Sequence, residues 1–379
     1  MSAMPERILV VKLADLGDAL LATPAIRGLR RRFPEARIEV LTAPAGAEIL
    51  RLCPDVDEVI VFDKRAFDSP SGLLRPRGAA GLARLGLRLR RRNYARVVLL
   101  HHLTSRFGAA KYRALCLASG APIRAGLDNG RGDFLTHRTL DYGYGGRSEL
   151  AYGLAVIATL GAEPEDPAPA LAVPEAARQE AHALLRAEGV AGPYLVIHPS
   201  VGSYAPVRNW SPARLGQVAA RLATETGLPI VVVGAAEARA TADVAEREVR
   251  GVDLVGRTSV PQLAALLEGA ALVIGSDSGV QHLAAAAGAP VLTIFGPSNQ
   301  DAWLPYDSVI WQPGQPLPES RRVVVRAGIP CSPCLYTGYA LGRRDGCGRP
   351  TCLALVTVEM VTQIARTILS LQTPCPARN

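Results

Sequence analysis

Residues 8–41, ILVVKLADLGDALLATPAIRGLRRRFPEARIEVL, decide the fold class of this chain. Residues 8–13 form an apolar run interrupted only by Lys12, which is typical of a strand buried on both faces. A loop holding Gly17 follows, and residues 19–32 have the apolar spacing of a helix before a second strand over residues 37–41. A strand, a helix and a strand in this order predict a parallel β-sheet.

The same alternation continues on both sides of a less regular middle part. In the first half it predicts strands over residues 58–62 and 96–100 and an Arg-rich helix over residues 78–92. In the second half it predicts strands over residues 194–198, 229–233, 253–255, 271–275 and 291–295, and helices over residues 212–226, 236–249, 260–267 and 280–287. Each half therefore resembles a Rossmann fold.

A proline-rich stretch, residues 163–174, is the best candidate for a linker between the two halves. We therefore expect an N-terminal domain over residues 1–172 and a C-terminal domain over residues 173–356. A final amphipathic helix and tail, residues 357–379, is expected to pack back across the domains.

Composition restricts the class of protein. The chain has 379 residues, of which 49% are hydrophobic, so each half can bury its own core. No apolar run is long enough to span a membrane and the N-terminus does not resemble a signal peptide, so we expect a cytoplasmic protein.

The net charge of +8 comes partly from Arg runs, which are usually solvated helix ends. An anionic acceptor or the inner face of a membrane is the alternative partner, whereas nucleic acid is not expected because the basic runs lack interleaved aromatics.

Loops that follow the predicted strands carry the candidate ligand-binding residues, because parallel sheets bind ligands at the carboxyl ends of their strands. After residue 275, Asp277, Ser278 and Gly279 lead into a helix with His282 in its first turn, an arrangement suited to an anion. After residue 198, Ser200 and Gly202 precede the cation Arg208, and Glu237 follows the next strand. The alternative for the segment after residue 275 is a capped helix that binds nothing. The alternative for the loop after residue 198 is an ordinary surface loop, and the alternative for Glu237 is a residue of the first helical turn.

The first loop carries carboxylates where a dinucleotide-binding protein would carry glycines. Asp15, Gly17 and Asp18 stand there without a G-x-G-x-x-G pattern, which disfavours an NAD-dependent dehydrogenase. Asp18 suits a general base, and the alternative is that it caps the following helix.

Four of the seven cysteines are clustered at Cys331, Cys334, Cys347 and Cys352, whereas Cys53, Cys116 and Cys375 are isolated. The cluster has the spacing C-x2-C, twelve residues, C-x4-C, which predicts a structural four-thiolate site for zinc or iron. The intervening segment has no clear helix or strand pattern, and a metal would supply its missing core. Free thiols in a loop are the alternative interpretation.

Several blocks of the chain resemble glycosyltransferase family nine, the ADP-heptose:lipopolysaccharide heptosyltransferases. These are residues 8–41, HPSVGSYAPVRNW (198–210), RTSVPQLAALLEGA (257–270) and GSDSGVQHLAAAAGAPVLTIFGPSNQDAWLP (275–305). The resemblance implies an α/β GT-B fold with two Rossmann-like domains whose parallel sheets face across a cleft. It also implies an acceptor-binding first domain, a nucleotide-sugar-binding second domain, and inversion without a catalytic metal.

The resemblance also assigns roles to single residues. Asp18 falls on the catalytic carboxylate, with Asp15 and Gly17 on the acceptor side, and Arg208 falls on a position usually held by a Lys that neutralises the diphosphate. The remaining positions are expected to bind the donor: Ser200, Gly202, Glu237 at the ribose, Thr258 and Ser259 at the base, and Asp277, Ser278, Gly279 and His282 at the diphosphate and sugar. Some relatives that glycosylate autotransporter proteins carry iron on four cysteines.

The resulting hypothesis is a glycosyltransferase of lipopolysaccharide biosynthesis that moves a heptose from an ADP-sugar to a hydroxyl of the core. A protein or a small natural product such as an aminocyclitol is the alternative acceptor. A nucleotide-sugar epimerase is the enzymatic alternative, and a non-catalytic nucleotide-sugar-binding protein is the alternative of another class.

Overall fold

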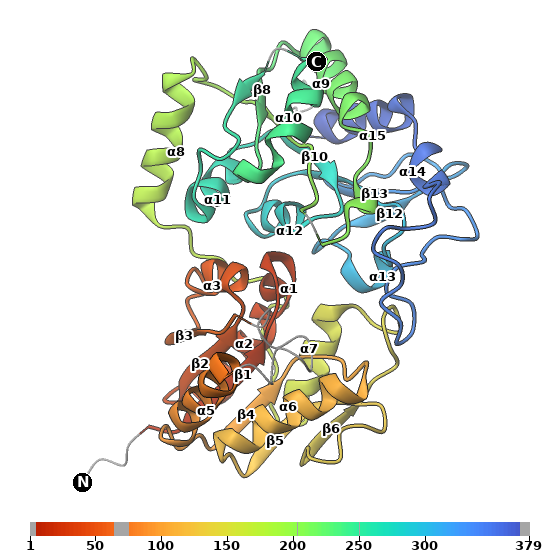
Figure 1. The fold of residues 1–379 in the computed structure, drawn as a ribbon. Helices are drawn as coiled ribbons and strands as arrows, with labels where there is room; N and C mark the ends of the chain where they lie inside the picture. Colours follow the sequence, from red (N-terminus) through yellow and green to blue (C-terminus); the bar gives the residue numbers. More distant parts are fainter. Residues whose placement is uncertain (1–4, 64–75, 203, 250, 372–379) are drawn as a thin grey trace, which may run out of the picture. The chain divides into compact units, whose positions relative to one another are not determined.

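The computed structural model describes residues 5–63, 76–202, 204–249 and 251–371 (Figure 1). The chain divides into two compact units, Met1–Ala172 and Val173–Asn379. The division falls inside the proline-rich stretch 163–174, which contains neither helix nor strand. Each unit is built around one parallel sheet, which confirms the predicted α/β fold class.

The first unit has a six-stranded parallel sheet in the order β3-β2-β1-β4-β5-β6. Its strands are β1 (Arg7–Lys12), β2 (Arg37–Thr42), β3 (Glu58–Val61), β4 (Arg96–Leu99), β5 (Ile123–Asp128) and β6 (His137–Leu140). Its helices are α1 (Leu16–Leu21), α2 (Thr23–Arg32), α3 (Pro44–Leu50), α5 (Pro76–Arg90), α6 (Arg106–Ser119) and α7 (Glu149–Ala158). The strand order reverses between β1 and β4, and in such sheets ligands bind beyond the carboxyl ends of the strands at that point.

Alternate residues of β1 face two separate cores. Ile8 and Val10 pack with residues of α2 and α7, whereas Leu9 and Val11 pack with residues of α5 and α6. Helices therefore cover both faces of the sheet, which explains why β1 is apolar at nearly every position.

The amino edge of this sheet holds an ionic cluster around Glu39, whose side chain is 0% exposed. Arg7, Arg37 and Arg92 pair with that carboxylate, and the Tyr94 hydroxyl donates to it. Glu58 joins the cluster and also pairs with Arg88. Arg88 and Arg92 of the Arg-rich segment are thus paired within the unit, at the edge opposite the carboxyl ends of the strands.

The second unit has a seven-stranded parallel sheet in the order β12-β13-β11-β10-β7-β8-β9. Its strands are β7 (Leu195–His198), β8 (Ile230–Val232), β9 (Val252–Asp253), β10 (Leu272–Ser276), β11 (Val291–Ile294), β12 (Val309–Trp311) and β13 (Arg322–Val325). Its helices are α8 (Glu175–Ala187), η2 (Pro206–Arg208), α9 (Pro212–Thr226), η3 (Ala236–Ala238), α10 (Arg239–Glu246), α11 (Val260–Glu268), α12 (Gly279–Ala286), α13 (Gln300–Trp303), α14 (Thr351–Ala354) and α15 (Val358–Ser370). The strand order reverses between β7 and β10.

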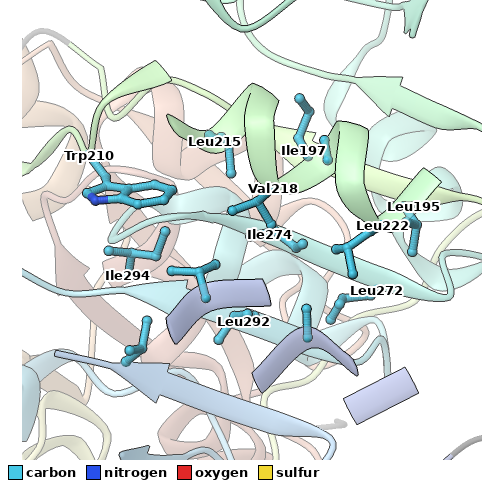
Figure 2. Packing of buried hydrophobic residues seen from close by; sticks show 14 of the residues in the cluster. Leu195, Ile197, Trp210, Leu215, Val218, Leu222, Leu272, Ile274, Leu292 and Ile294 are labelled. Atoms are coloured by element: carbon cyan, nitrogen blue, oxygen red, sulfur yellow. The ribbon is translucent and has the colours of Figure 1, made fainter. Parts of the chain in front are cut away.

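A hydrophobic core of this unit lies between the sheet and helices α9 and α15. Figure 2 shows Leu215, Val218 and Leu222 of α9 directed toward strand residues such as Ile274. Val361, Ile364 and Ile368 of α15 belong to the same core. The sequence-based division placed this helix in a segment of its own, and the structure packs it on α9, β10, β11 and β13 within the second unit.

Three sequence-based expectations about elements need correction. The single helix expected over residues 19–32 is two helices, α1 and α2, which are separated at Ala22. The irregular middle part contains α6, β5, β6 and α7. Residues 291–295 are not the last strand, because β12 and β13 extend the sheet beyond β11. Among the described residues, no helix combines the length and apolar character needed to cross a membrane.

Candidate active site

The carboxyl ends of β7 and β10 lie side by side in the second unit. Gly275 is paired with His198 across the two strands. The loop that leaves β7 returns to the end of β10, where the backbone N–H of Trp210 donates to Ser276 Oγ at 2.8 Å. The indole Nε1 of Trp210 donates to the carbonyl oxygen of Val356, which ties the same loop to the core. Two of the loops predicted to bind the donor are therefore joined at the point where the strand order reverses.

Helix α12 begins directly after this junction. Ser278 occupies its N-cap position, yet no side chain caps the helix. The Ser278 hydroxyl lies instead 3.2 Å from His198 Nδ1. Neither Asp277 nor Ser278 therefore acts as the side-chain cap that was the alternative interpretation, and Gly279 is the first helical residue. An amino end of this kind, with its dipole and backbone N–H groups, suits an anion.

Arg208 lies beside this helix, at the end of the short helix η2. Its Nη1 is 3.4 Å from Asp277 Oδ2, and its side chain is 16% exposed. Further contacts to the carbonyl oxygens of Val201 and Ala205 hold the guanidinium on its own loop. Burial lowers the pKa of the nearby His198 imidazole to about 4, so His198 is neutral at pH 7. Arg208, rather than His198, is therefore a cation beside the start of α12.

The other predicted donor residues follow the ends of β7, β8 and β9, which are neighbours in the sheet. Ser200 accepts a hydrogen bond from the backbone N–H of Gly202 at 3.4 Å, and Gly202 has a φ of 73°, in the region that favours glycine. Glu237 is exposed in η3. Ser259 caps α11, in a capping box with Gln262, and Thr258 precedes it. The structure thus brings these residues to one edge of one sheet.

His282 and Gln281 are both buried in α12. His282 was predicted from the sequence to bind the donor, whereas Gln281 was not. Gln281 is 0% exposed and lies over Gly275, where a Cβ atom would collide with its amide nitrogen. No hydrogen-bond partner is found for its amide among the described residues. The one feature of the sequence that could have indicated Gln281 is that it is a polar residue next to His282 in an otherwise apolar helix.

In the first unit, the carboxylates predicted on the acceptor side lie at the start of α1. This helix begins at Leu16, so Asp18 is its third residue and does not cap it. Asp15 holds the N-cap position without a side-chain capping hydrogen bond and is exposed. Gly17 is buried and Asp18 is half-buried. Asp18 thus stands in the first turn after β1, at the point where the order of the first sheet reverses.

The four clustered cysteines lie near one another without forming a metal site. Burial, with the neighbouring thiols Cys334, Cys331 and Cys347, raises the pKa of the Cys352 thiol. Yet no group of three or more His, Cys, Asp or Glu side chains in the described ranges is arranged to hold a metal ion. The Sγ of Cys347 donates instead to the carbonyl oxygen of Arg349. The predicted four-thiolate arrangement is therefore not formed. Cys53 and Cys116 are buried and separate, and Cys375 lies outside the described residues.

The segment between these cysteines has other support. The backbone N–H groups of Cys334 and Leu335 donate to the carbonyl oxygen of Pro297, and Thr337 and Ala340 form an isolated antiparallel bridge. The Asn299 amide donates to the carbonyl oxygen of Tyr336 at 2.9 Å. Composition did not reveal these loop contacts, which hold the segment in the structure.

Solved structures share this architecture along the whole chain. The glycosyl transferase family 9 structure from Veillonella parvula DSM 2008 is 23% identical and matches with a TM-score of 0.73, covering 98% of this chain and 99% of that one. The structure of E. coli heptosyltransferase WaaC with ADP is 19% identical, with a TM-score of 0.67, covering 96% and 99%. The two parallel α/β units therefore define the fold of a GT-B glycosyltransferase.

The family follows from the sequence. The family model described as glycosyltransferase family 9 (heptosyltransferase) matches residues 82–335, and the chain belongs to this family. The chain is also 27% identical over 307 residues to lipopolysaccharide heptosyltransferase 3 of Escherichia coli strain K12, covering 78% of this chain and 84% of that protein. The resemblance stated from the sequence blocks is confirmed.

Proposed function

We propose that this glycosyltransferase moves a heptose from ADP-heptose to an acceptor hydroxyl, with inversion and without a catalytic metal. The first unit binds the acceptor and the second binds the donor. The observation that carries the proposal is the position of Arg208 beside the α12 amino end, which carries no side-chain cap. A diphosphate is the part of a nucleotide sugar that a cation and a helix amino end would recognise together.

In this proposal the second unit stabilises the leaving group. Negative charge builds on the diphosphate as the sugar departs, and Arg208 with the backbone N–H groups of Ser278 and Gly279 is already oriented to meet it. Asp277, before α12, and His282, within α12, contact the diphosphate and sugar in this proposal. Glu237 binds the ribose and Thr258 and Ser259 contact the base. Ser200 and Gly202 line the diphosphate loop.

In the first unit, Asp18 is the general base. It takes the proton of the acceptor hydroxyl while that oxygen attacks the anomeric carbon from the face opposite the diphosphate. The support is its place in the first turn after β1, with Asp15 and Gly17 beside it and no glycine-rich phosphate loop around it. A general base contributes about 100- to 10,000-fold to such a step.

The acceptor we propose is the lipopolysaccharide core, because the relative from Escherichia coli is a lipopolysaccharide heptosyltransferase. The protein would then work in the cytoplasm and meet the inner face of the membrane through its acceptor. Parallel assays with lipopolysaccharide core, a carrier protein and an aminocyclitol distinguish the three acceptor classes. Product formed only with the protein or the aminocyclitol would contradict the proposal.

The central test is Asp18→Asn in the full chain, with Asp133→Asn as control. Asp133 is an exposed carboxylate of the same unit that pairs with Arg113. We expect Asp18→Asn to lower the rate of transfer by at least about 100-fold and to leave ADP-heptose binding unchanged within about twofold, because the base acts only in the chemical step. A variant that keeps more than a tenth of the wild-type rate would rule out the role of Asp18.

Measurements of donor binding and of the reaction product distinguish a glycosyltransferase from a non-catalytic binding protein and from an epimerase. Tight binding of ADP-heptose by the wild type without turnover on any acceptor would identify a non-catalytic binding protein. Conversion of the free nucleotide sugar to its epimer would identify an epimerase.

A further inference from the structure

A buried charged network lies in the first unit, outside the residues assigned so far. His102 Nδ1 is 2.8 Å from Asp141 Oδ1, and His102 Nε2 is 2.8 Å from Glu149 Oε1. The other oxygen of Glu149 lies 3.3 Å from Lys12 Nζ. These four side chains are between 0% and 7% exposed. Such a network is stable in the interior only when its charges are paired.

The four residues come from distant parts of the chain and meet at the carboxyl edge of the sheet. Lys12 is the last residue of β1, His102 follows β4, Asp141 follows β6, and Glu149 is the first residue of α7. Asp141 also accepts hydrogen bonds from the Asn129 amide and from the backbone N–H of Gly143. The network therefore joins three strand ends and one helix at the edge where Asp18 lies.

An imidazole with a carboxylate at each nitrogen donates from both, and this requires the protonated form. Burial lowers the pKa of His102, but the carboxylates of Asp141 and Glu149 outweigh burial and raise the pKa to about 9. The network then contains two cations, His102 and Lys12, and two carboxylates, so its formal charges balance. Tyr144 and Tyr152 also pack against His102, and burial raises the pKa of Tyr152 to about 12 although the nearby cation Arg147 lowers it.

The network is continuous with the segment that carries Asp18. Lys12 is held by Glu149, and the backbone N–H of the next residue, Leu13, donates to His101 Nε2 at 2.6 Å. The His101 ring stacks on Tyr112, with ring centroids 4.7 Å apart. A Cβ atom on Gly46 of α3 would lie only 2.6 Å from the carbonyl oxygen of Ala14, so α3 closes tightly over this segment. Lys12, Leu13 and Ala14 are thus each in contact with another part of the unit, and α1 begins shortly after them, at Leu16.

We propose that His102 is a positioning residue for Asp18, which in its protonated form holds Glu149 on Lys12 and so fixes the end of β1 from which α1 starts. The inference rests on the proposed role of Asp18. Loss of the His102 proton leaves two carboxylates facing one buried cation. The charges then no longer balance, and the Lys12–Glu149 contact loosens. A base misplaced by about an ångström costs about 100-fold in rate.

The test compares His102→Gln and Glu149→Gln with His137→Gln, a substitution at a histidine of the same unit outside the network. Turnover is measured as ADP release from ADP-heptose with lipopolysaccharide core, from pH 6 to pH 10. We expect both network variants to lower kcat by about 10- to 100-fold with KM for ADP-heptose within about twofold of wild type, because they misplace the base and leave donor binding intact. The wild-type kcat should fall as pH rises through about 9, and this alkaline decline should be absent in His102→Gln.

An NMR titration of wild-type His102 provides a readout that does not depend on activity or on the folding of a variant. A measured pKa of His102 below 7 would overturn the inference. So would an unchanged kcat and alkaline decline in His102→Gln while Asp18→Asn is inactive, which would leave the proposed function intact. Full activity of Asp18→Asn would instead contradict the proposed function itself.

Discussion

The Arg208 guanidinium and the Asp277 carboxylate form an ion pair across two loops of the second unit, with Nη1 3.4 Å from Oδ2. The pair joins the loop after β7 to the loop after β10, beside the start of α12. The separation is at the long end for a charged hydrogen bond, and Arg carries more donors than this contact uses. A diphosphate placed at α12 would therefore engage Arg208 without first breaking a strong internal bond.

Arg208→Ala should weaken ADP binding by about 10- to 100-fold and adenosine binding by less than about threefold, because only ADP presents charge to the guanidinium. Isothermal titration of both ligands measures the difference. Arg221→Ala is the control, since Arg221 forms an exposed pair with Glu359 on α9 and α15. Equal losses for ADP and adenosine would mean that Arg208 supports the fold or the base site instead.

His198 should make the second unit sensitive to acid. Burial lowers the pKa of the folded-state imidazole from 6.5 to about 4, so the unfolded chain takes up a proton that the folded chain excludes. The stability that His198 contributes is therefore complete above pH 6.5 and is lost as pH falls from 6.5 toward 4. His198→Gln should show a smaller loss of stability between pH 7 and pH 5, measured from urea unfolding midpoints. The same pH dependence in both proteins would show that folding does not change the pKa of His198.

Gly216→Ala should destabilise the second unit. The added Cβ on α9 would collide with the carbonyl oxygen of Ala245 and lie 2.7 Å from the Cβ of Glu248, so α9 and α10 must separate. We expect the overpacking to cost about 1–3 kcal/mol, which a gain in helix propensity of about 1 kcal/mol offsets only in part. Gly192→Ala is the matched control, because nothing lies within 4 Å of its added Cβ. The melting temperatures of Gly216→Ala and Gly192→Ala are compared, and equal values would contradict the close approach of α9 and α10.

The cysteine cluster can be tested directly by elemental analysis of protein purified without chelator. Because the four thiols are not arranged as ligands, we expect less than about a tenth of an equivalent of zinc plus iron, with the thiols of Cys331, Cys334 and Cys347 reacting freely. Close to one equivalent of either metal, with protected thiols, would restore the structural site predicted from the cysteine spacing.

The two parallel sheets could be predicted because their strands are buried on both faces and read as continuous apolar runs, as in residues 8–13 and 271–275. β12 and β13 were missed because they follow a loop with no helix between them and β12 has only three residues. The break between α1 and α2 at Ala22 could not be predicted, since apolar spacing runs through it.

The position of a candidate residue at a strand end was predictable where one local segment defines it, as for Asp277, Ser278 and Gly279 between β10 and α12. Residues that act through distant partners were not predictable. Lys12 was noticed only as an exception within an apolar strand, and nothing near it in the sequence indicates Glu149, its partner 137 residues away. The pairing of Arg92 with Glu39 is hidden in the same way, so the Arg runs looked more available to ligands than the folded unit leaves them.

The cluster at the amino edge of the first sheet has an evolutionary consequence. Glu39 is fully buried and receives three arginines and a tyrosine, so replacing Glu39 alone would remove the carboxylate that all four partners share. Positions 7, 37, 39 and 92 should therefore vary together among homologous chains. Homologues with an apolar residue at position 39 should also have lost the arginine at position 92, and drift at this edge should proceed by paired replacements rather than single ones.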